Sequence, residues 1–130
     1  AAQAVGVIPA RIAKSLSFLT PEGCVLIIAA GDARVDNSKY KHHFGVKAKM
    51  LTPEQVVEYT GHAIGGVCPF AISRPDVRIY LDISLQRFDT VFPAAGSANS
   101  AIELTCAELE QYACNCQGWA DLCKGWQTEE

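Results

Sequence analysis

Residues 65–70 read Gly-Gly-Val-Cys-Pro-Phe, a segment whose backbone could bind an anion. Gly65 and Gly66 permit backbone conformations that other residues avoid, and they let a ligand approach the main chain. Successive N–H groups in such a loop can bind an oxyanion or a phosphate, and Pro69 would hold those donors in place. The alternative is a tight helix-to-strand connection that needs glycine only for its geometry. The segment is neither a Walker motif nor a dinucleotide fingerprint, because their glycine spacing and lysine are missing.

Two side chains could add chemistry to this segment. Cys68 would be a nucleophile if a base or a cation made it a thiolate, and His62 is the nearest histidine in the sequence. A small thiol that lines a pocket is the more common use of cysteine. Lys14 precedes the apolar residues of an expected strand, where its ammonium could bind a phosphate or a polarised carbonyl. The alternative is an edge-strand lysine that guards against aggregation.

Basic side chains are concentrated in one stretch of the chain. Between Asp36 and Glu54 the sequence has no acidic residue but contains Lys39, Lys41, His42, His43, Lys47 and Lys49. Acidic residues predominate from Glu103 onward. This distribution permits a local anion-binding face, although a solvated surface is the commoner explanation of four lysines.

Length and composition limit the class of protein. A chain of 130 residues, 49% hydrophobic and 19% charged, predicts one domain with a single core. Its net charge of -3 is not typical of a nucleic-acid-binding protein, and no apolar run is long enough to cross a membrane. No secretory signal is visible, and we expect the six cysteines to be free thiols in a reducing cytosol. Four of them lie near the C-terminus but lack a C-x-x-C pair, so we expect no metal: Cys106, Cys114, Cys116 and Cys123.

Hydrophobic periodicity and capping residues predict the elements that position these groups. We expect strands at 14–19, 24–30, 47–51, 77–82, 89–95, 101–104 and 119–123, and helices at 37–44, 53–60 and 106–114. A four-residue turn at 20–23 makes a hairpin of the first two strands. The fold class is therefore α+β, a single domain over residues 1–130 with a mixed, mostly antiparallel sheet and flanking helices. Residues 1–6 resemble the last turn of a helix, so we expect an N-terminal piece with the start of that helix to be missing.

The order of the motifs carries more information than any one of them. Along the chain stand Arg-Ile-Ala-Lys-Ser-Leu at 11–16, Ala-Gly-Asp at 30–32, Arg-Val-Asp at 34–36, Thr-Gly-His at 60–62, residues 64–70, Asp82, and Ala-Gly-Ser-Ala-Asn at 95–99 before Glu103-Leu104. This series resembles the YbaK/EbsC family, relatives of the editing domain inserted in bacterial prolyl-tRNA synthetases. The resemblance covers nearly the whole chain, and it implies an N-terminal strand and helix start before the position of Ala1. Ala71 departs from it, since relatives often have glycine there.

The resemblance implies a free-standing deacylase that hydrolyses the ester of mischarged aminoacyl-tRNA, with a small amino acid on tRNA-Pro or a similar tRNA. It implies a catalytic role for Lys14, Gly65 and Gly66, and substrate binding by Val67, Cys68, Pro69, Gly31, Asp32, Asp82, Gly96, Ser97 and Asn99. The partner is the 3′ end of aminoacyl-tRNA, with a prolyl-tRNA synthetase or another tRNA carrier as a further candidate. No cofactor, metal or membrane is expected, and the site of action is the cytoplasm. Two alternatives stay open: a non-catalytic aminoacyl- or tRNA-binding module of the same fold, and a hydrolase that depends on Cys68.

Overall fold

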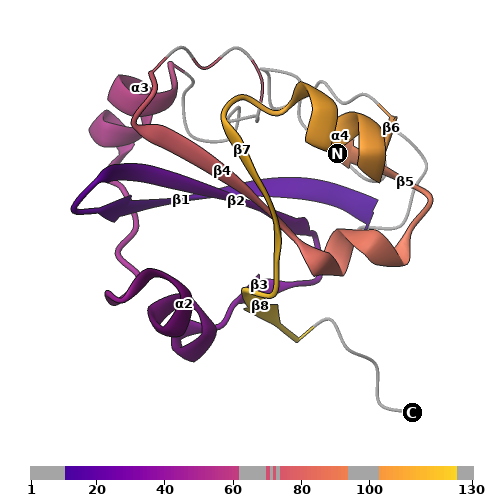
Figure 1. Ribbon diagram of the computed structural model, residues 1–130, viewed down its shortest axis with the longest axis horizontal. Coiled ribbons are helices and arrows are strands. Elements are labelled where there is room, and N and C mark those ends of the chain that lie inside the picture. The colour runs from indigo at the N-terminus through magenta and orange to yellow at the C-terminus, as the bar shows by residue number, and fades with distance from the viewer. Residues whose placement is uncertain (1–10, 62–69, 71, 73, 94–102, 126–130) are drawn as a thin grey trace.

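A six-stranded sheet forms the centre of the computed structural model, which describes residues 11–61, 70, 72, 74–93 and 103–125. The strand order is β6-β5-β1-β2-β4-β7, and β3 and β8 form a separate two-stranded sheet (Figure 1). The strands are β1 (Ile12–Thr20), β2 (Gly23–Ala30), β3 (Arg34–Val35), β4 (Val77–Asp82), β5 (Thr90–Pro93), β6 (Leu104–Thr105), β7 (Cys116–Ala120) and β8 (Cys123–Lys124). The helices are α2 (Asn37–Phe44), α3 (Pro53–Thr60), α4 (Cys106–Tyr112) and the 3-10 helix η2 (Ile83–Arg87).

The β1–β2 hairpin is the predicted one, with a shorter loop. Thr20 pairs with Gly23, so only Pro21 and Glu22 remain outside the ladder instead of the four residues expected. Gly23 has a φ of 127°, and a Cβ there would collide with the carbonyl oxygen of Asp76. That oxygen accepts a hydrogen bond from Cys24 N at 3.0 Å, which ties the hairpin to the start of β4. All eight residues of β2 are buried, as the unbroken apolar run predicts.

The sheet is mixed, which confirms the predicted fold class of a single α+β domain with flanking helices. β1 pairs with β2, and β5 with β6, in antiparallel register. β2 with β4, β4 with β7, and β1 with β5 are parallel. Parallel pairs are more frequent among the described strands than expected, because β2 and β4 are joined by a long crossover that contains α2 and α3.

The predicted starts of the three helices are confirmed by their capping contacts, whereas α4 ends at Tyr112, two residues before the predicted end. The Asp36 side chain accepts hydrogen bonds from the first turn of α2, which ends at Gly45 in the left-handed conformation. Capping boxes open α3 and α4, formed by Thr52 with Gln55 and by Thr105 with Glu108. Within the described residues, no helix has the length and apolar character of a membrane span.

Two predicted strands were wrong in extent. In 47–51, only Met50 forms a β-bridge, with Phe18, and Leu19 N donates to Lys49 O at 2.7 Å. The segment is held against β1 by a few contacts, among them Leu51 N donating to Ser17 O at 3.3 Å, and does not extend into a strand. The stretch 119–123 is divided between β7 and β8, because residues 121 and 122 leave the main sheet to pair β8 with β3.

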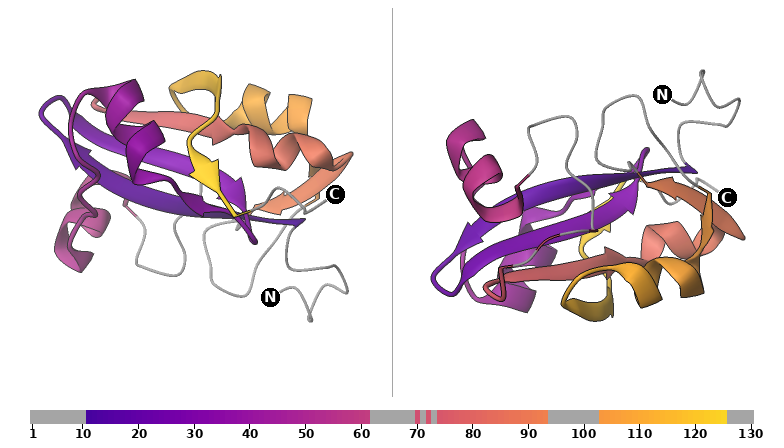
Figure 2. Two further views of the ribbon diagram at one scale, coloured as in Figure 1. Left: turned by 90° about the horizontal axis from the view of Figure 1, so that it is seen from below. Right: turned by 90° about the horizontal axis from the view of Figure 1, so that it is seen from above.

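Helices α2 and α3 lie on opposite sides of the sheet near the hairpin end (Figures 1 and 2). Tyr40 holds α2 in place: it is fully buried, with its ring centroid 5.1 Å from that of Phe18 and 4.5 Å from that of Phe44. The side of α2 away from Tyr40 is left exposed, and it carries Lys41 and His42.

Candidate functional site

Lys14 lies near the start of β1, opposite Ala29 in the hairpin register, and is partly buried. We call this end of the sheet, where β1 begins and β2 and β4 end, the polar end. Among the described residues, the Lys14 Nζ donates one hydrogen bond, a long one of 3.4 Å, to the carbonyl oxygen of Gly31, the residue that follows β2. β1 lies between β5 and β2 in the sheet, and its described pairing with β5 ends at Ala13, the residue before Lys14. Its ammonium group is therefore placed at a strand end with a weak local partner.

Asp32 lies beside Lys14 but is held by a different cation. The Arg87 guanidinium, which follows β4 in η2, donates two hydrogen bonds to its carboxylate at 2.6 and 3.0 Å. These bonds lower the pKa of Asp32 below its ordinary value, and the nearby Lys14 charge acts in the same direction. Asp32 is therefore a carboxylate whose charge is matched by Arg87, which leaves the Lys14 ammonium less compensated.

Asp82 ends β4 beneath this pair and is fully buried. One carboxylate oxygen accepts Ser84 N at 2.9 Å, and the other accepts Leu122 N at 2.8 Å. Ser84 Oγ in turn accepts Ala30 N at 3.1 Å, which extends the end of β2. Asp82 thus joins the ends of β2 and β4 to the segment before β8. With no exposed atom, it supports the site and has no surface for a substrate.

Cys123 completes this polar end from β8. Burial raises the pKa of its thiol to about 12, and the neighbouring Asp82 carboxylate adds to the effect. Cys123 is therefore protonated at neutral pH. Lys39 of α2 donates to its carbonyl oxygen at 2.9 Å, so α2 is tied directly to the polar end of the sheet. The five described cysteines have free thiols, and among the described side chains no cluster of His, Cys, Asp and Glu has the arrangement of a metal site.

The predicted site residues fall into two groups. Lys14, Gly31 and Asp32 come together as one cluster, with Asp82 below it. The others lie outside the described residues: Gly65, Gly66, Val67, Cys68, Pro69, Gly96, Ser97 and Asn99. Sequence reasoning missed Arg87 and Ser84. A lone arginine and serine in a polar segment give no signal, because their partners stand 55 and 54 residues away along the chain.

Chemically, the described part of the site can bind an anion. One ammonium stands at the carboxyl ends of β2 and the adjoining β4, and the carboxylates near it are occupied by Arg87 and by backbone N–H groups. Such an arrangement suits a phosphate or the developing negative charge of an ester under attack.

Comparison with known proteins assigns the chain to a family. Residues 1–112 match the aminoacyl-tRNA editing domain family. The chain belongs to this family. Lys14, its hydrogen-bond partner Gly31, and the neighbouring Asp32 and Arg87 lie inside the matched range, whereas β7 and β8 lie beyond it.

Individual relatives agree with the assignment to the editing domain family. The protein YwhH of Bacillus subtilis (strain 168) is 56% identical over 129 residues, which are 98% of this chain and 80% of YwhH. The multifunctional Ser/Thr-tRNA deacylase ProXp-y of Escherichia coli (strain K12) is 31% identical over 91 residues, 68% of this chain and 54% of that enzyme. A crystal structure of a candidate trans-editing enzyme for prolyl tRNA synthetase superposes with a TM-score of 0.86 at 37% identity, covering 95% of this chain and 77% of that one.

Proposed function

We propose that this editing domain is a deacylase that acts in trans and hydrolyses the ester bond of mischarged aminoacyl-tRNA. The observation that carries the proposal is the placement of Lys14, the cation of the family motif, at a strand end with one long hydrogen bond. The likeness to a Ser/Thr-tRNA deacylase supports the reaction, and the likeness to a trans-editing enzyme supports action on a small amino acid carried by tRNA-Pro or a similar tRNA.

In the proposed reaction, water adds to the ester carbonyl carbon and the bond to the ribose oxygen then breaks. The products are the free amino acid and a tRNA with a free terminal hydroxyl. An aminoacyl ester is already activated, so catalysis needs a positioned water and stabilisation of the oxyanion more than it needs a strong nucleophile. We assign to Lys14 the binding of this negative charge or of the terminal phosphate. Arg87 keeps Asp32 from pairing with Lys14, and Asp82 is a positioning residue that holds the strand ends together.

The rest of the pocket is proposed from the sequence. Backbone N–H groups of Gly65 and Gly66 would bind the oxyanion, with Val67, Cys68 and Pro69 around the aminoacyl group. Gly96, Ser97 and Asn99 would contact the substrate from a second segment. Residues 62–69 and 94–102 lie outside the described residues. A second site of this kind serves translation because a synthetase gains only about 1–3 kcal/mol of discrimination from one methylene.

The partners follow from the same proposal. The family acts on aminoacyl-tRNA, and we propose that the 3′ end of the tRNA enters the Lys14 site. A prolyl-tRNA synthetase or another tRNA carrier would deliver it, and the reaction would take place in the cytoplasm. No cofactor is required by the chemistry, because hydrolysis consumes only water.

The deciding experiment measures release of amino acid from a panel of tRNAs charged with cysteine, alanine, serine or threonine. The wild type is compared with Lys14→Ala and with Lys124→Ala, which removes an exposed lysine of β8. We expect turnover of at least one substrate by the wild type and by Lys124→Ala, and a loss of about 100-fold or more in Lys14→Ala, the scale of one lost charge-stabilising donor. No release from any tRNA would overturn the enzyme proposal, and full activity of Lys14→Ala would overturn the role of Lys14.

The same assay separates the two alternatives. A non-catalytic binding module would hold aminoacyl-tRNA or an aminoacyl-adenosine analogue without releasing amino acid. A hydrolase that depends on Cys68 would be inactivated by thiol alkylation and by Cys68→Ala. We expect Cys68→Ala to keep most of the deacylase activity.

A further inference from the structure

The exposed side of α2 carries an unusual concentration of donors. Tyr40 turns the inner side of the helix into the core, so Lys41, His42 and His43 face solvent. The helix ends at Gly45, and the chain then runs back alongside it to Lys47, which is also exposed.

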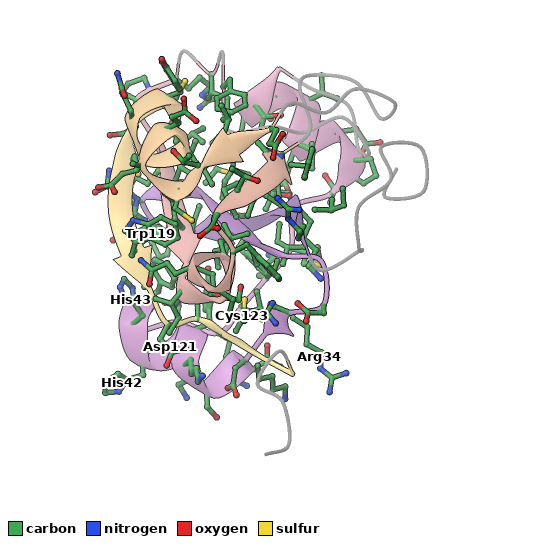
Figure 3. The ribbon with its side chains drawn as sticks, turned by 90° about the vertical axis from the view of Figure 1, so that its right-hand side faces the viewer. Arg34, His42, His43, Trp119, Asp121 and Cys123 are labelled. Carbon is green, nitrogen blue, oxygen red and sulfur yellow. The ribbon has the colours of Figure 1, made fainter. Side chains whose placement is uncertain are left out.

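Two adjoining hollows lie on this side of the helix. One, of about 340 Å³, is lined by Asn37, Ser38, Lys41, Lys47 and Ala48. The other, of about 460 Å³, is lined by Ser38, Lys39, His42, His43 and Asp121. Ser38 borders both, so the hollows form one surface. Figure 3 shows His42, His43 and Asp121 near one another, where α2 meets the segment between β7 and β8. We call Ser38, Lys41, His42, His43 and Lys47 the α2 basic face.

The surface that lines the two hollows has a net positive charge, because its ion pair, between Lys39 and Asp121, cancels and the other lysines remain. Among the described residues that line the hollows, Asp121 is the one carboxylate, and Lys39 Nζ binds it at 2.8 Å. This hydrogen bond raises the pKa of Lys39, whose ammonium also donates to the Cys123 carbonyl oxygen at 2.9 Å. Within the described part of the chain, Lys41 and Lys47 have no ion pair. Their ammonium groups are therefore available to an external anion.

The α2 basic face is connected to the Lys14 site through Cys123. Lys39 binds the Cys123 carbonyl oxygen, and both Lys39 and Lys14 lie within electrostatic range of the Cys123 thiol. Lys39 thus ties α2 to the end of the sheet that carries Lys14, so one long polyanion could contact both regions. The overall charge of -3 makes such a local positive surface necessary, because the rest of the molecule repels a polyanion.

We propose that the α2 basic face binds the sugar–phosphate backbone of the tRNA whose aminoacylated 3′ end is held at Lys14. The inference rests on the proposed function and adds a second contact region to it. Lysine ammonium groups, a hydroxyl and imidazoles are donors that proteins use toward phosphate oxygens, and such contacts position a nucleic acid without reading its bases. Binding here is thus insensitive to tRNA sequence and steeply dependent on salt.

The test uses the full chain with Lys41→Gln/Lys47→Gln, the two single variants, and Lys124→Gln as a matched loss of one exposed lysine outside the face. Binding of tRNA is measured across a salt series. We expect the double variant to lose about tenfold in affinity at low salt, and the slope of log affinity against log salt to fall by about 2, since each phosphate contact contributes about 1. Each single variant should show about half of that change in slope, and Lys124→Gln should show none.

A kinetic comparison separates this inference from the proposed function. Deacylation is measured on full-length aminoacyl-tRNA and on 3′-aminoacyl-adenosine, which has no backbone phosphates. The double variant should lose at least about five times more rate on the tRNA than on the adenosine ester, because only the tRNA reaches α2. An unchanged salt slope, or an equal change in Lys124→Gln, would overturn the inference while deacylation stands. Absence of deacylation by the wild type on both substrates would overturn the proposed function, and the salt slopes would still decide whether α2 binds tRNA.

Discussion

The same central strands form two very different environments at their two ends. From the hairpin to the centre of the sheet, β2 is buried and packs apolar side chains such as Ile27. The polar end, where β1 begins and β2 and β4 end, carries Lys14, Asp82 and the ion pair of Asp32 with Arg87. The apolar part supplies the rigidity, and the polar part uses it to hold an ammonium with only one long hydrogen bond. Stability and activity should therefore be sensitive to substitutions of different residues in the same strand pair.

The largest effects should appear when one side chain is truncated in each of the two environments. Ile27→Ala removes a fully buried side chain from the centre of the sheet and should lower the free energy of unfolding by about 3–4 kcal/mol. Lys14→Ala should change that free energy by less than about 1 kcal/mol while abolishing most deacylation, because Lys14 is only partly buried and weakly bonded. Urea unfolding and amino acid release measured on both variants make the comparison. A large loss of stability in Lys14→Ala would erase the distinction between the two ends.

Asp82 should behave like the core although it is charged and lies at the polar end. Asp82→Ala leaves Ser84 N and Leu122 N without their acceptor in a buried position, so we expect a loss of about 3 kcal/mol in the free energy of unfolding. The exposed Asp89 provides the control, as Asp89→Ala should change stability by less than about 0.5 kcal/mol. Equal stability of the two variants in urea would show that Asp82 does not hold the strand ends together.

Arg87 should affect activity through the charge of its partner. Without Arg87, the Asp32 carboxylate is left to pair with Lys14, so we expect Arg87→Gln to lower kcat/KM by about tenfold, the effect of one added ion pair of about 1.4 kcal/mol. Asp32→Asn removes the competing charge and should restore most of the activity in the double variant. Kinetics of the single and double variants form the cycle. Additive losses would mean that Asp32 and Arg87 act independently of each other, and would overturn the role given to Arg87.

The smallest effect should be an alkaline loss of stability that belongs to the buried thiols. Burial raises the pKa of Cys24 and of Cys123 to about 12 from an ordinary 9.0. Above pH 9 the unfolded chain therefore binds fewer protons than the folded one, and the free energy of unfolding should fall as pH rises toward 12. At pH 10 each thiol should account for about 1 kcal/mol relative to pH 7. Unfolding of wild type and Cys24→Ala at both values measures this, and an equal fall in both would refute the contribution of Cys24.

Much of the local structure was predictable because its causes are local. The helix starts at Asp36, Thr52 and Thr105 depend on side chains that reach backbone N–H groups two or three residues away. The β1–β2 hairpin depends on a turn and two adjacent apolar runs. Segment 47–51 was misassigned because how far it pairs with β1 is set by tertiary contacts, and only Met50 forms a bridge there.

Local sequence patterns were enough to predict the hairpin, the helix starts, the family motifs and the choice of Lys14 as the central residue. Which charges are available depends on the tertiary structure. It pairs Asp32 with Arg87, Asp82 with the backbone of Leu122, and Lys39 with Asp121, across 55, 40 and 82 residues of chain. Those separations are closed by the register of non-adjacent strands and by the position of α2, which no local pattern encodes. The result is a site ammonium and an exposed lysine pair whose charges the protein itself leaves largely uncompensated.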